Sequence, residues 1–544
     1  MVRDLRRLAD SRFDLVVVGA GFYGAVAAWD ATLRGLSVAI IDKGDFGGAT
    51  SFNNLKTLHG GLRSLQSLNF RQMRLFIRER RALARVAPHL VYPLPFIVPT
   101  FRHPARSRLA MRVALTINDL VSSDRHEGLS DPGLQLPPSL VVSREECLRL
   151  NPLIERHGVT GGAIWHDYQM HNTDRMTLAF VLSAAGSGAV AANYVEATAL
   201  LRDSTRVLGV KAHDVLTSET FDLRGDVVIN ATGPWAAHFL DYLGGERHTT
   251  PALLLSRAMN IVTREIPVSQ GCGGRAAGRY LFLAPWRDVT LVGTSHDVHE
   301  GGPDALTVTR WDLEAFLADV REAFPHANLT AGDVRLIHRG LLPMVSGREH
   351  HVRLLRESAV VDHTRDGIAG LVSMFGVRYT TARYTAARAV DCVFRQRGIR
   401  QPPPCRTEDT PVIGGAISNK ENFLKAVLLR DIEGVSTDML GRLALTYGTL
   451  YDAVVQLLRE DPALAGPLGR TCPVSGAEIL YAVRHESAVR LSDALIRRTE
   501  AGSAGHPGTD AVERAAVIMS QALGWDEWQM RNEIAEVEAF YRLP

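Results

Sequence analysis

Residues 13–24 read FDLVVVGAGFYG and decide the fold of this chain. An apolar strand pattern runs into a turn with the spacing G-x-G-x-x-G, a helical pattern follows, and a second apolar run ends at Asp42. Gly19 permits the tight turn, Gly21 lets a pyrophosphate approach the backbone, and Gly24 allows the helix to pack closely on the strand. The helix N-terminus offers free N–H groups to phosphates, and Asp42 can accept hydrogen bonds from a ribose. The sequence therefore predicts a βαβ dinucleotide-binding unit.

A second segment favours FAD over NAD as the dinucleotide. Residues 226–235 read DVVINATGPW, the pattern of a buried strand that ends in Ala231-Thr232-Gly233. In two-dinucleotide-binding folds such a strand returns beneath the flavin, where small residues let the backbone lie close to the cofactor. The three residues could simply end a strand, but their combination with the N-terminal unit favours a flavin.

The pattern along the chain predicts two domains, because 544 residues are too many for one hydrophobic core. Residues 1–400 are expected to form an α/β, Rossmann-like domain. Its FAD-binding segments are about 12–100, 150–250 and 340–398, and its inserted antiparallel substrate lobe is about 250–340. A proline-rich linker at 400–405 leads into a helical domain over 405–544.

Composition excludes several classes of protein. The net charge of +2 argues against nucleic-acid binding, which needs a concentrated basic excess. The five cysteines are scattered without a C-x-x-C pair, so neither a metal site nor a disulfide framework is indicated. The N-terminus has no apolar signal core, and the chain has no apolar run of 18 residues. A cytoplasmic location is expected.

Several motifs together resemble the FAD-dependent glycerol-3-phosphate dehydrogenases and oxidases, within the D-amino-acid-oxidase-like class of flavoproteins. The resemblance covers almost the whole chain, and the run His59-Gly-Gly-Leu-Arg63 with the C-terminal domain is specific to this branch. The residues that carry it are Gly19–Gly24, Ala49–Ser51, Lys56, Leu58–Arg63, Ala87–Leu90, Asp174, Arg175, Asn230–Trp235, Gly293, Thr294, Phe375, Gly376, Thr380, Thr381, Tyr447, Gly448, Tyr481–Glu486 and Leu523–Trp525.

The resemblance implies an FAD-binding domain of the glutathione-reductase/D-amino-acid-oxidase type, the inserted lobe and an all-α C-terminal domain. It also implies a small anionic substrate, a quinone or oxygen as electron acceptor and a role in glycerol metabolism, and it leaves a homodimer open. The cofactor-binding residues carried over are Gly19, Gly21, Phe22, Tyr23, Gly24, Asp42, Lys43, Thr50, Ser51, Asn54, Lys56, Leu58, His59, Gly60, Gly61, Val195, Ala231, Thr232, Gly233, Trp235, Gly376, Val377, Arg378, Tyr379 and Thr380.

Three residues are the candidate catalytic groups. Arg63 follows two glycines, where the family's arginine faces the substrate. His59 could be the general base, since imidazole titrates near the working pH, or a neutral histidine packed against the flavin. Arg378 stands where the family usually has lysine, and it offers a planar fork in place of a point charge.

The substrate pocket departs from the family pattern. Leu342 occupies the position of a phosphate-binding arginine, and Arg339, three residues away on the same strand, is expected to point to the opposite face. Ser64 replaces a tyrosine, and Asn260, with Arg257 nearby, replaces a histidine. The candidate substrate-binding residues are Arg63, Ser64, Arg257, Asn260, Arg339 and Arg378.

Three functions follow from these observations. The first is a glycerol-3-phosphate dehydrogenase-like enzyme that oxidises a secondary alcohol of a small anion by hydride transfer to flavin N5. The second is a specialised FAD-dependent enzyme for a different hydroxy or amino substrate in a biosynthetic pathway, which Leu342, Ser64 and Asn260 motivate. The third is a flavin-binding scaffold without turnover, which leaves His59, Arg63 and Arg378 unexplained.

Segment 101–118 has two interpretations. Its arginines alternate with aliphatic residues, as in an interfacial helix on anionic lipid at the inner face of the cytoplasmic membrane. The same pattern also fits an ordinary packed helix with solvated arginines, because Pro104 and a loose periodicity blur it.

Overall fold

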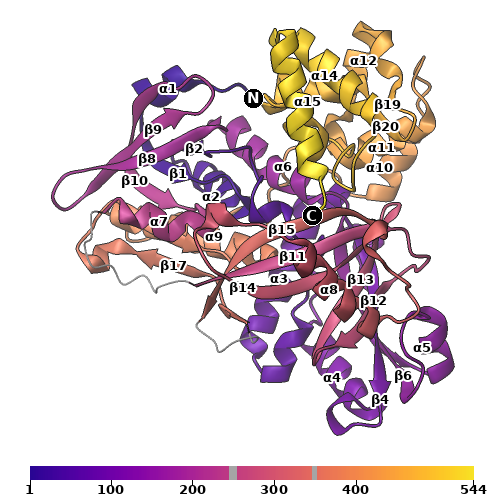
Figure 1. Cartoon of the computed structure of the whole chain (residues 1–544). Helices are drawn as coiled ribbons and strands as arrows, with labels where there is room; N and C mark the ends of the chain where they lie inside the picture. Colours follow the sequence, from indigo (N-terminus) through magenta and orange to yellow (C-terminus); the bar gives the residue numbers. More distant parts are fainter. Residues whose placement is uncertain (244–253, 346–351) are drawn as a thin grey trace.

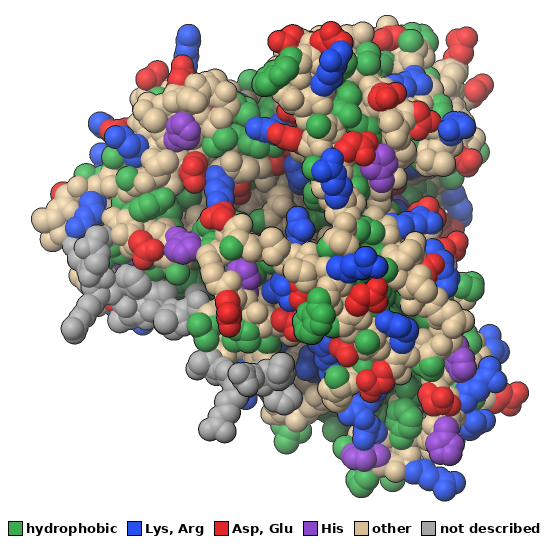
Figure 2. Space-filling view, in the orientation of Figure 1, with side chains coloured by type: hydrophobic (Ala, Val, Ile, Leu, Met, Phe, Trp, Pro, Cys, Tyr) green, Lys and Arg blue, Asp and Glu red, His purple; other side chains and the backbone are tan. Residues whose placement is uncertain are grey.

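The structure, a computed structural model, describes residues 1–243, 254–345 and 352–544. Two large sheets and a helical C-terminal domain make up the molecule (Figure 1). The predicted segment limits near 250 lie outside the described residues. On the face drawn in Figure 2, Lys and Arg side chains are interspersed with Asp and Glu over the C-terminal domain and the lobe.

The first sheet is the predicted dinucleotide-binding sheet. Its strands follow the order β17-β18-β10-β1-β2-β7, and the antiparallel pair β8–β9 extends from β10. The central strands are parallel and almost fully buried, because helices cover them and each strand presents apolar residues on both faces. The strands are β1 (Arg12–Val18), β2 (Val38–Ile41), β7 (Val190–Ala192), β8 (Val195–Arg202), β9 (Val207–Asp214), β10 (Thr220–Asn230), β17 (Ala359–Asp362) and β18 (Leu371–Phe375).

The helices α2, α6 and α9 pack beside one another on the first sheet and share one apolar core with it. α2 is alanine-rich and almost entirely buried, since it is covered by helices as well as by the sheet. The helices of residues 1–400 are α1 (Leu5–Asp10), α2 (Phe22–Leu33), α3 (Phe70–Val86), α4 (Arg108–Val121), α5 (Arg144–Leu150), α6 (Thr173–Gly186), α7 (Ala236–Asp241), α8 (Arg310–Ala323) and α9 (Ala382–Gln396).

The second sheet contains the strands of the predicted lobe at about 250–340 and also includes strands from earlier in the chain. Its order is β16-β15-β11-β14-β13-β12-β4-β6-β3, with β5 on β6. β4 joins β12 by a short parallel contact, which attaches strands from residues 57–170 to the lobe. The strands are β3 (Thr57–Leu58), β4 (Val91–Phe101), β5 (Leu140–Val142), β6 (Val159–Met170), β11 (Leu254–Arg264), β12 (Gly271–Ala276), β13 (Arg279–Trp286), β14 (Val289–His299), β15 (Val334–Val345) and β16 (Arg353–Leu354).

The C-terminal domain is helical, as predicted, and adds one short hairpin, β19 (Pro467–Gly469) with β20 (Cys472–Ser475). Its apolar core continues into the lobe through Phe52, Trp286 and Leu336, so the domain is packed against the lobe. Its helices are α10 (Lys420–Leu428), α11 (Thr437–Tyr447), α12 (Tyr451–Glu460), α13 (Gly476–Glu486), α14 (Thr509–Leu523) and α15 (Glu527–Tyr541).

Segment 101–118 is only partly helical. β4 extends to Phe101, and α4 begins at Arg108 behind the cap of Ser107, whose side chain accepts from the Ala110 N–H at 3.2 Å. Leu115 is the buried residue of α4, while Leu109, Val113 and Leu120 are exposed. Within the described ranges, no helix has the length and apolar character needed to cross a membrane.

Candidate functional site

The glycine-rich turn has the geometry that its sequence predicts. Gly19 has a φ of +100°, and a Cβ there would lie 2.5 Å from the Ala231 carbonyl oxygen. A Cβ on Gly24 would overlap the Gly19 carbonyl oxygen. At Gly21, the cap of α2, the nearest atom to such a Cβ is the Ser51 Oγ at 3.1 Å. The first and third glycines are therefore required by packing, while the second borders an open cavity.

Asp42 lies at the end of β2 on the wall of the same cavity. Its carboxylate accepts from the Ala20 N–H at 2.7 Å and from the Gly44 N–H at 2.9 Å. Burial raises its pKa to about 6, against the opposing effect of these two hydrogen bonds. The two bonds fix the carboxylate beside the turn, as a ribose-binding group requires.

A single cavity of about 2330 Å³ joins the two sheets. Most of the predicted cofactor-binding residues line it, which is the arrangement that FAD needs: a helix N-terminus for the diphosphate, an acid for the ribose and a long slot for the flavin. They are Gly19, Gly21, Phe22, Tyr23, Asp42, Lys43, Thr50, Ser51, Asn54, His59, Gly61, Ala231, Thr232, Gly233, Trp235, Gly376, Val377, Arg378, Tyr379 and Thr380.

Other predicted cofactor residues lie behind the cavity wall. Gly24, Lys56, Leu58, Gly60 and Val195 are not among its lining residues. The Lys56 ammonium is buried, donates to the Phe52 carbonyl at 2.9 Å and lies over the Phe52 and Trp286 rings. Burial lowers its pKa to about 8. In this structure Lys56 holds the loop that carries Thr50 and Ser51, rather than facing the cavity.

Two predicted substrate ligands also lie away from the cavity. Arg257 forms a bidentate ion pair with Asp312 of α8. Arg339 is exposed on β15, whereas Leu342 of the same strand lines the cavity, so these two side chains take opposite faces as the strand period requires. The structure therefore places neither arginine where it can replace the missing phosphate ligand.

His59 lies beside a buried carboxylate. Its Nδ1 is 3.6 Å from Asp167 Oδ2, and its backbone N–H donates to Thr380 Oγ1 at 3.2 Å. Asp167 also accepts from the Gly60 N–H at 2.6 Å and from the Arg80 guanidinium. Burial alone would raise the pKa of Asp167, but His59, Arg80 and the Gly60 amide together hold it below the usual value. Asp167 is thus an ionised partner that can orient the His59 ring.

Two cationic groups face the cavity near one another. The Arg378 guanidinium donates to the Arg356 carbonyl at 2.9 Å and lies 5.4 Å from the centre of the Phe76 ring. Burial, followed by the charge of Arg63, lowers the pKa of Arg378. Neither Arg63 nor Arg378 forms an ion pair with a carboxylate in the part of the chain described. Two cations that face one cavity without a paired carboxylate can attract an anion.

The remaining predicted substrate residues have internal partners. Asn260 is buried between Thr294, whose Oγ1 donates to it at 2.6 Å, and Asn53, which accepts from it at 3.1 Å. Ser64 lines the cavity, and its Oγ donates to Gln72 Oε1 at 3.4 Å. Ser64 and Asn260 therefore belong to the wall without adding charge to it.

His296 of β14 lines the cavity and was not predicted from the sequence. Its Nδ1 is buried and has no hydrogen-bond partner among the residues that the structure describes. Burial, then the charges of Arg279 and Arg63, lowers its pKa to about 4, so the ring is neutral at physiological pH. His296 is two residues after Thr294 on the same strand, so the sequence indicates that the two side chains share one face. It does not indicate that this face lines the cavity.

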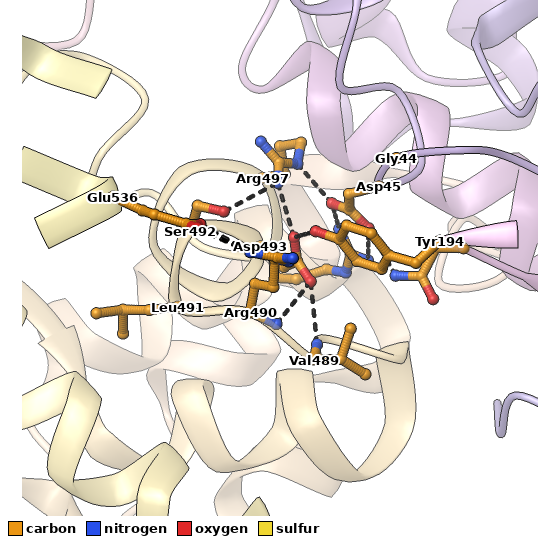
Figure 3. Close-up of polar contacts among 12 residues, drawn as sticks. Gly44, Asp45, Tyr194, Val489, Arg490, Leu491, Ser492, Asp493, Arg497 and Glu536 are labelled. Atoms are coloured by element: carbon orange, nitrogen blue, oxygen red, sulfur yellow. Dashed lines mark hydrogen bonds and ion pairs between the residues drawn. The ribbon is translucent and has the colours of Figure 1, made fainter. Parts of the chain in front are cut away.

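A buried ionic cluster, which we call the interdomain lock, joins the C-terminal domain to the dinucleotide end of the cavity (Figure 3). Asp45 accepts from the Arg498 guanidinium in a bidentate pair of 2.7 and 2.6 Å and from Arg497 Nε. Arg497 also donates to Asp493 at 2.7 Å, and the Tyr194 hydroxyl donates to Asp493 at 2.6 Å. Both arginines come from a π-helical turn, Asp493–Arg498, and Arg497 itself lines the cavity.

A βαβ glycine turn, a ribose-binding acid and a returning Ala-Thr-Gly strand around one cavity define a flavin-dinucleotide oxidoreductase. The chain belongs to the FAD-dependent oxidoreductase family, whose model matches residues 14–392, and residues 405–530 match the C-terminal domain of alpha-glycerophosphate oxidase. It is an FAD-dependent oxidoreductase of the glycerol-3-phosphate dehydrogenase type, as the sequence motifs predict.

Similar proteins support this assignment along the full chain. The glycerol-3-phosphate dehydrogenase of Mycobacterium leprae is 31% identical over 98% of this chain and 88% of its own length. That of Synechocystis is 27% identical over 99% of this chain and 98% of its own. The fold matches that of the Bacillus halodurans glycerol-3-phosphate dehydrogenase complexed with FAD, with a TM-score of 0.77 and 24% identity over 98% of this chain and 95% of that one.

Proposed function

We propose that this protein oxidises the secondary hydroxyl of a small anion, with glycerol 3-phosphate as the first candidate substrate. The observation that carries the proposal is the pair of cavity-facing guanidinium groups of Arg63 and Arg378, which have no carboxylate partner within the described ranges. The named relatives are glycerol-3-phosphate dehydrogenases, and an anionic substrate is common to that type.

The chain supplies binding, orientation and proton transfer. FAD, when bound, supplies the two-electron acceptor. Arg63 and Arg378 hold the anionic end of the substrate and so align the carbon that is oxidised. His59 accepts the hydroxyl proton, and Asp167, 3.6 Å from its Nδ1, orients the ring and stabilises the imidazolium that forms.

An anaerobic stopped-flow experiment tests this proposal. The purified flavoprotein is mixed with glycerol 3-phosphate, and the visible absorbance of the flavin is followed. Rapid bleaching supports glycerol 3-phosphate as a substrate. A flavin that dithionite reduces but glycerol 3-phosphate does not would exclude this substrate and leave the class of enzyme in place.

A second candidate is a different hydroxy or amino anion, because Leu342 presents an apolar side chain to the cavity. The loss of a charge-assisted pair to a phosphate removes on the order of 1.5–3 kcal/mol of binding free energy. With Arg257 paired to Asp312 and Arg339 on the outer face, no arginine of β11 or β15 makes up this loss. A panel of hydroxy and amino acids in the same experiment tests this alternative.

We further propose that α4 contacts an anionic membrane surface from the cytoplasmic side, which brings a quinone acceptor within reach. Leu109 and Val113 are 72% and 53% exposed, and Arg112 lies between them on the exposed side of the helix. Apolar and basic side chains on one exposed surface suit the lipid interface. Flotation with anionic liposomes tests the contact, and a double Leu109→Glu, Val113→Glu variant that floats as well as the unchanged protein would contradict it.

A further inference from the structure

Beyond the arginines, the cavity continues along an aromatic wall that the proposed function does not use. Phe96, Trp165, Tyr280 and Phe282 come from β4, β6 and β13, and Leu62 and Met111 complete the lining. We call these six residues the aromatic slot. All but Phe96 also pack against the small core of Val98, Leu115 and Ala163, so the wall is supported from behind.

The rings are arranged as a rigid surface. Phe96 and Trp165 are stacked, with centroids 5.8 Å apart and planes 18° apart. Phe282 stands nearly perpendicular to both, at 5.9 Å from Phe96 and 6.3 Å from Trp165. Such a set offers both a face and an edge to a planar apolar group.

One carboxylate connects the aromatic slot to the reacting centre. Trp165 Nε1 donates to Asp167 Oδ2 at 3.2 Å, and the same oxygen lies 3.6 Å from His59 Nδ1. Leu62 of the slot is the residue before Arg63. A molecule held by Arg63 with its hydroxyl at His59 therefore has the slot as the neighbouring space.

The apolar surface of the slot indicates what kind of group fits it. A three-carbon phosphate has no apolar surface to cover four aromatic side chains, and aromatic surface left in contact with water gives up favourable burial.

From these observations we propose that the substrate of this enzyme is an anion that carries an aromatic or similarly planar apolar group, seated in the aromatic slot. The inference rests on the proposed function, because the anionic end of the same molecule is held by Arg63 and Arg378. It narrows the second candidate above to aryl-bearing hydroxy or amino anions.

The charge around the slot favours this occupant over a neutral lipid-soluble quinone. Arg106 and Arg275 line the same cavity as Tyr280. Neither has a carboxylate partner within the parts of the chain that the structure describes. The unpaired cations that line this cavity favour a molecule that is itself an anion.

Binding of two matched anions to the oxidised flavoprotein tests the proposal, with perturbation of the visible flavin spectrum as the readout. Propanoate presents the charge alone, and 3-phenylpropanoate presents the charge with a phenyl group. We expect 3-phenylpropanoate to bind about tenfold more tightly or better. Phe282→Ala should abolish this preference and leave propanoate binding unchanged, while Phe282→Leu should keep part of it.

Trp528→Ala, which removes an exposed tryptophan of α15 outside the cavity, is the control and should leave both affinities unchanged. Equal affinity of the two anions for the unchanged protein would overturn the slot while leaving the anion site in place. Binding of neither, with the flavin still reduced by dithionite, would overturn the anion site and the slot with it. A different result is that decylubiquinone displaces 3-phenylpropanoate and that Phe282→Ala slows only the reoxidation of the flavin. These two results together would assign the slot to the electron acceptor and would also overturn the proposal.

Discussion

The two ends of the cavity are built in different ways. At the dinucleotide end, recognition comes from the backbone: a glycine turn, a helix N-terminus and a carboxylate fixed by two main-chain N–H groups. The other end is lined by side chains on loops and strands, such as Arg63, Arg378 and the aromatic slot, and these are the groups that we propose recognise the substrate. Backbone geometry leaves few alternatives to glycine, whereas a strand accepts many side chains. The residues at the dinucleotide end therefore tolerate few substitutions, while those at the substrate end tolerate many.

The largest effect is expected at Gly24, where a Cβ would overlap the Gly19 carbonyl oxygen. Gly24→Ala should yield protein with little or no bound flavin, because the turn has to open to admit the methyl group. The ratio of flavin to protein absorbance measures this. Gly186→Ala is the matched control, since a Cβ there meets nothing within 4 Å, and it should keep its flavin. Full flavin content in Gly24→Ala would contradict the account of the turn.

The second largest effect is expected on the rate of flavin reduction by the substrate. His59→Gln should slow flavin reduction by about 10²–10⁴-fold, the usual contribution of a positioned general base. Flavin content should stay normal, because the ring is 55% exposed and is not required to pack the turn. Stopped-flow reduction with the identified substrate measures the rate. An unchanged rate would assign His59 to packing against the flavin.

Asp45→Asn should lower the free energy of unfolding by about 3–5 kcal/mol, because it leaves Arg497 and Arg498 buried without their shared carboxylate. Denaturant unfolding measures this loss. The exposed pair of Glu421 and Lys425 provides the control, and Glu421→Gln should give no measurable change. If Asp45→Asn were as stable as the unchanged protein, the interdomain lock would not hold the domains together.

The same lock predicts a pH dependence. The guanidinium groups of Arg498 and Arg497 outweigh the cost of burial and hold the pKa of Asp45 below its usual range. The stabilisation is therefore fully present above the unfolded-state pKa of about 3.9 and is lost as the pH falls through the lower folded value. The free energy of unfolding should depend less steeply on pH, between neutral and acid pH, in Asp45→Asn than in the unchanged protein. An identical pH dependence in the two proteins would contradict this prediction.

Removing a cation at the substrate end should weaken anion binding without loss of flavin. Arg378→Met should cost about tenfold to a hundredfold in affinity for the substrate anion. Arg378→Lys should recover part of it, since a point charge replaces a planar fork. Arg257→Met is the control, because Arg257 pairs with Asp312 outside the cavity. Equal losses in the two methionine variants would contradict the proposed anion site.

The smallest expected effect is a gain in affinity for glycerol 3-phosphate. Leu342→Arg restores a cation on the cavity-facing side of β15 and should tighten glycerol 3-phosphate binding by about tenfold or less. The affinity for the aryl-bearing anion should increase by no more than the affinity for glycerol 3-phosphate. Spectral titration of the flavin with both anions measures the difference. A variant that binds glycerol 3-phosphate no better would show that Leu342 is not the residue that separates this pocket from the family pattern.

Much of the fold and the residues at the dinucleotide end of the cavity could be predicted from the sequence. The glycine turn, Asp42, the Ala-Thr-Gly strand and the helical C-terminal domain follow from local patterns, because each depends on residues close together in the chain. The pairing of β4 with β12 could not be predicted, since the paired residues Phe96 and Gly271 are 175 positions apart and no periodicity reports such a pairing.

The remaining site residues depended on tertiary structure. Asp167 beside His59, His296 beside Arg63 and Trp165 in the aromatic slot come from strands whose patterns do not say what they face. Arg257 looked equivalent to other arginines until its ion pair with Asp312 removed it from the cavity, whereas the strand period already predicted that Arg339 faces away from Leu342. The interdomain lock joins Asp45 to arginines more than 450 residues away. The sequence by itself determined the cofactor class, because a backbone turn is a local property. The tertiary structure decided which charges and rings line the rest of the cavity, because those residues come from distant parts of the chain.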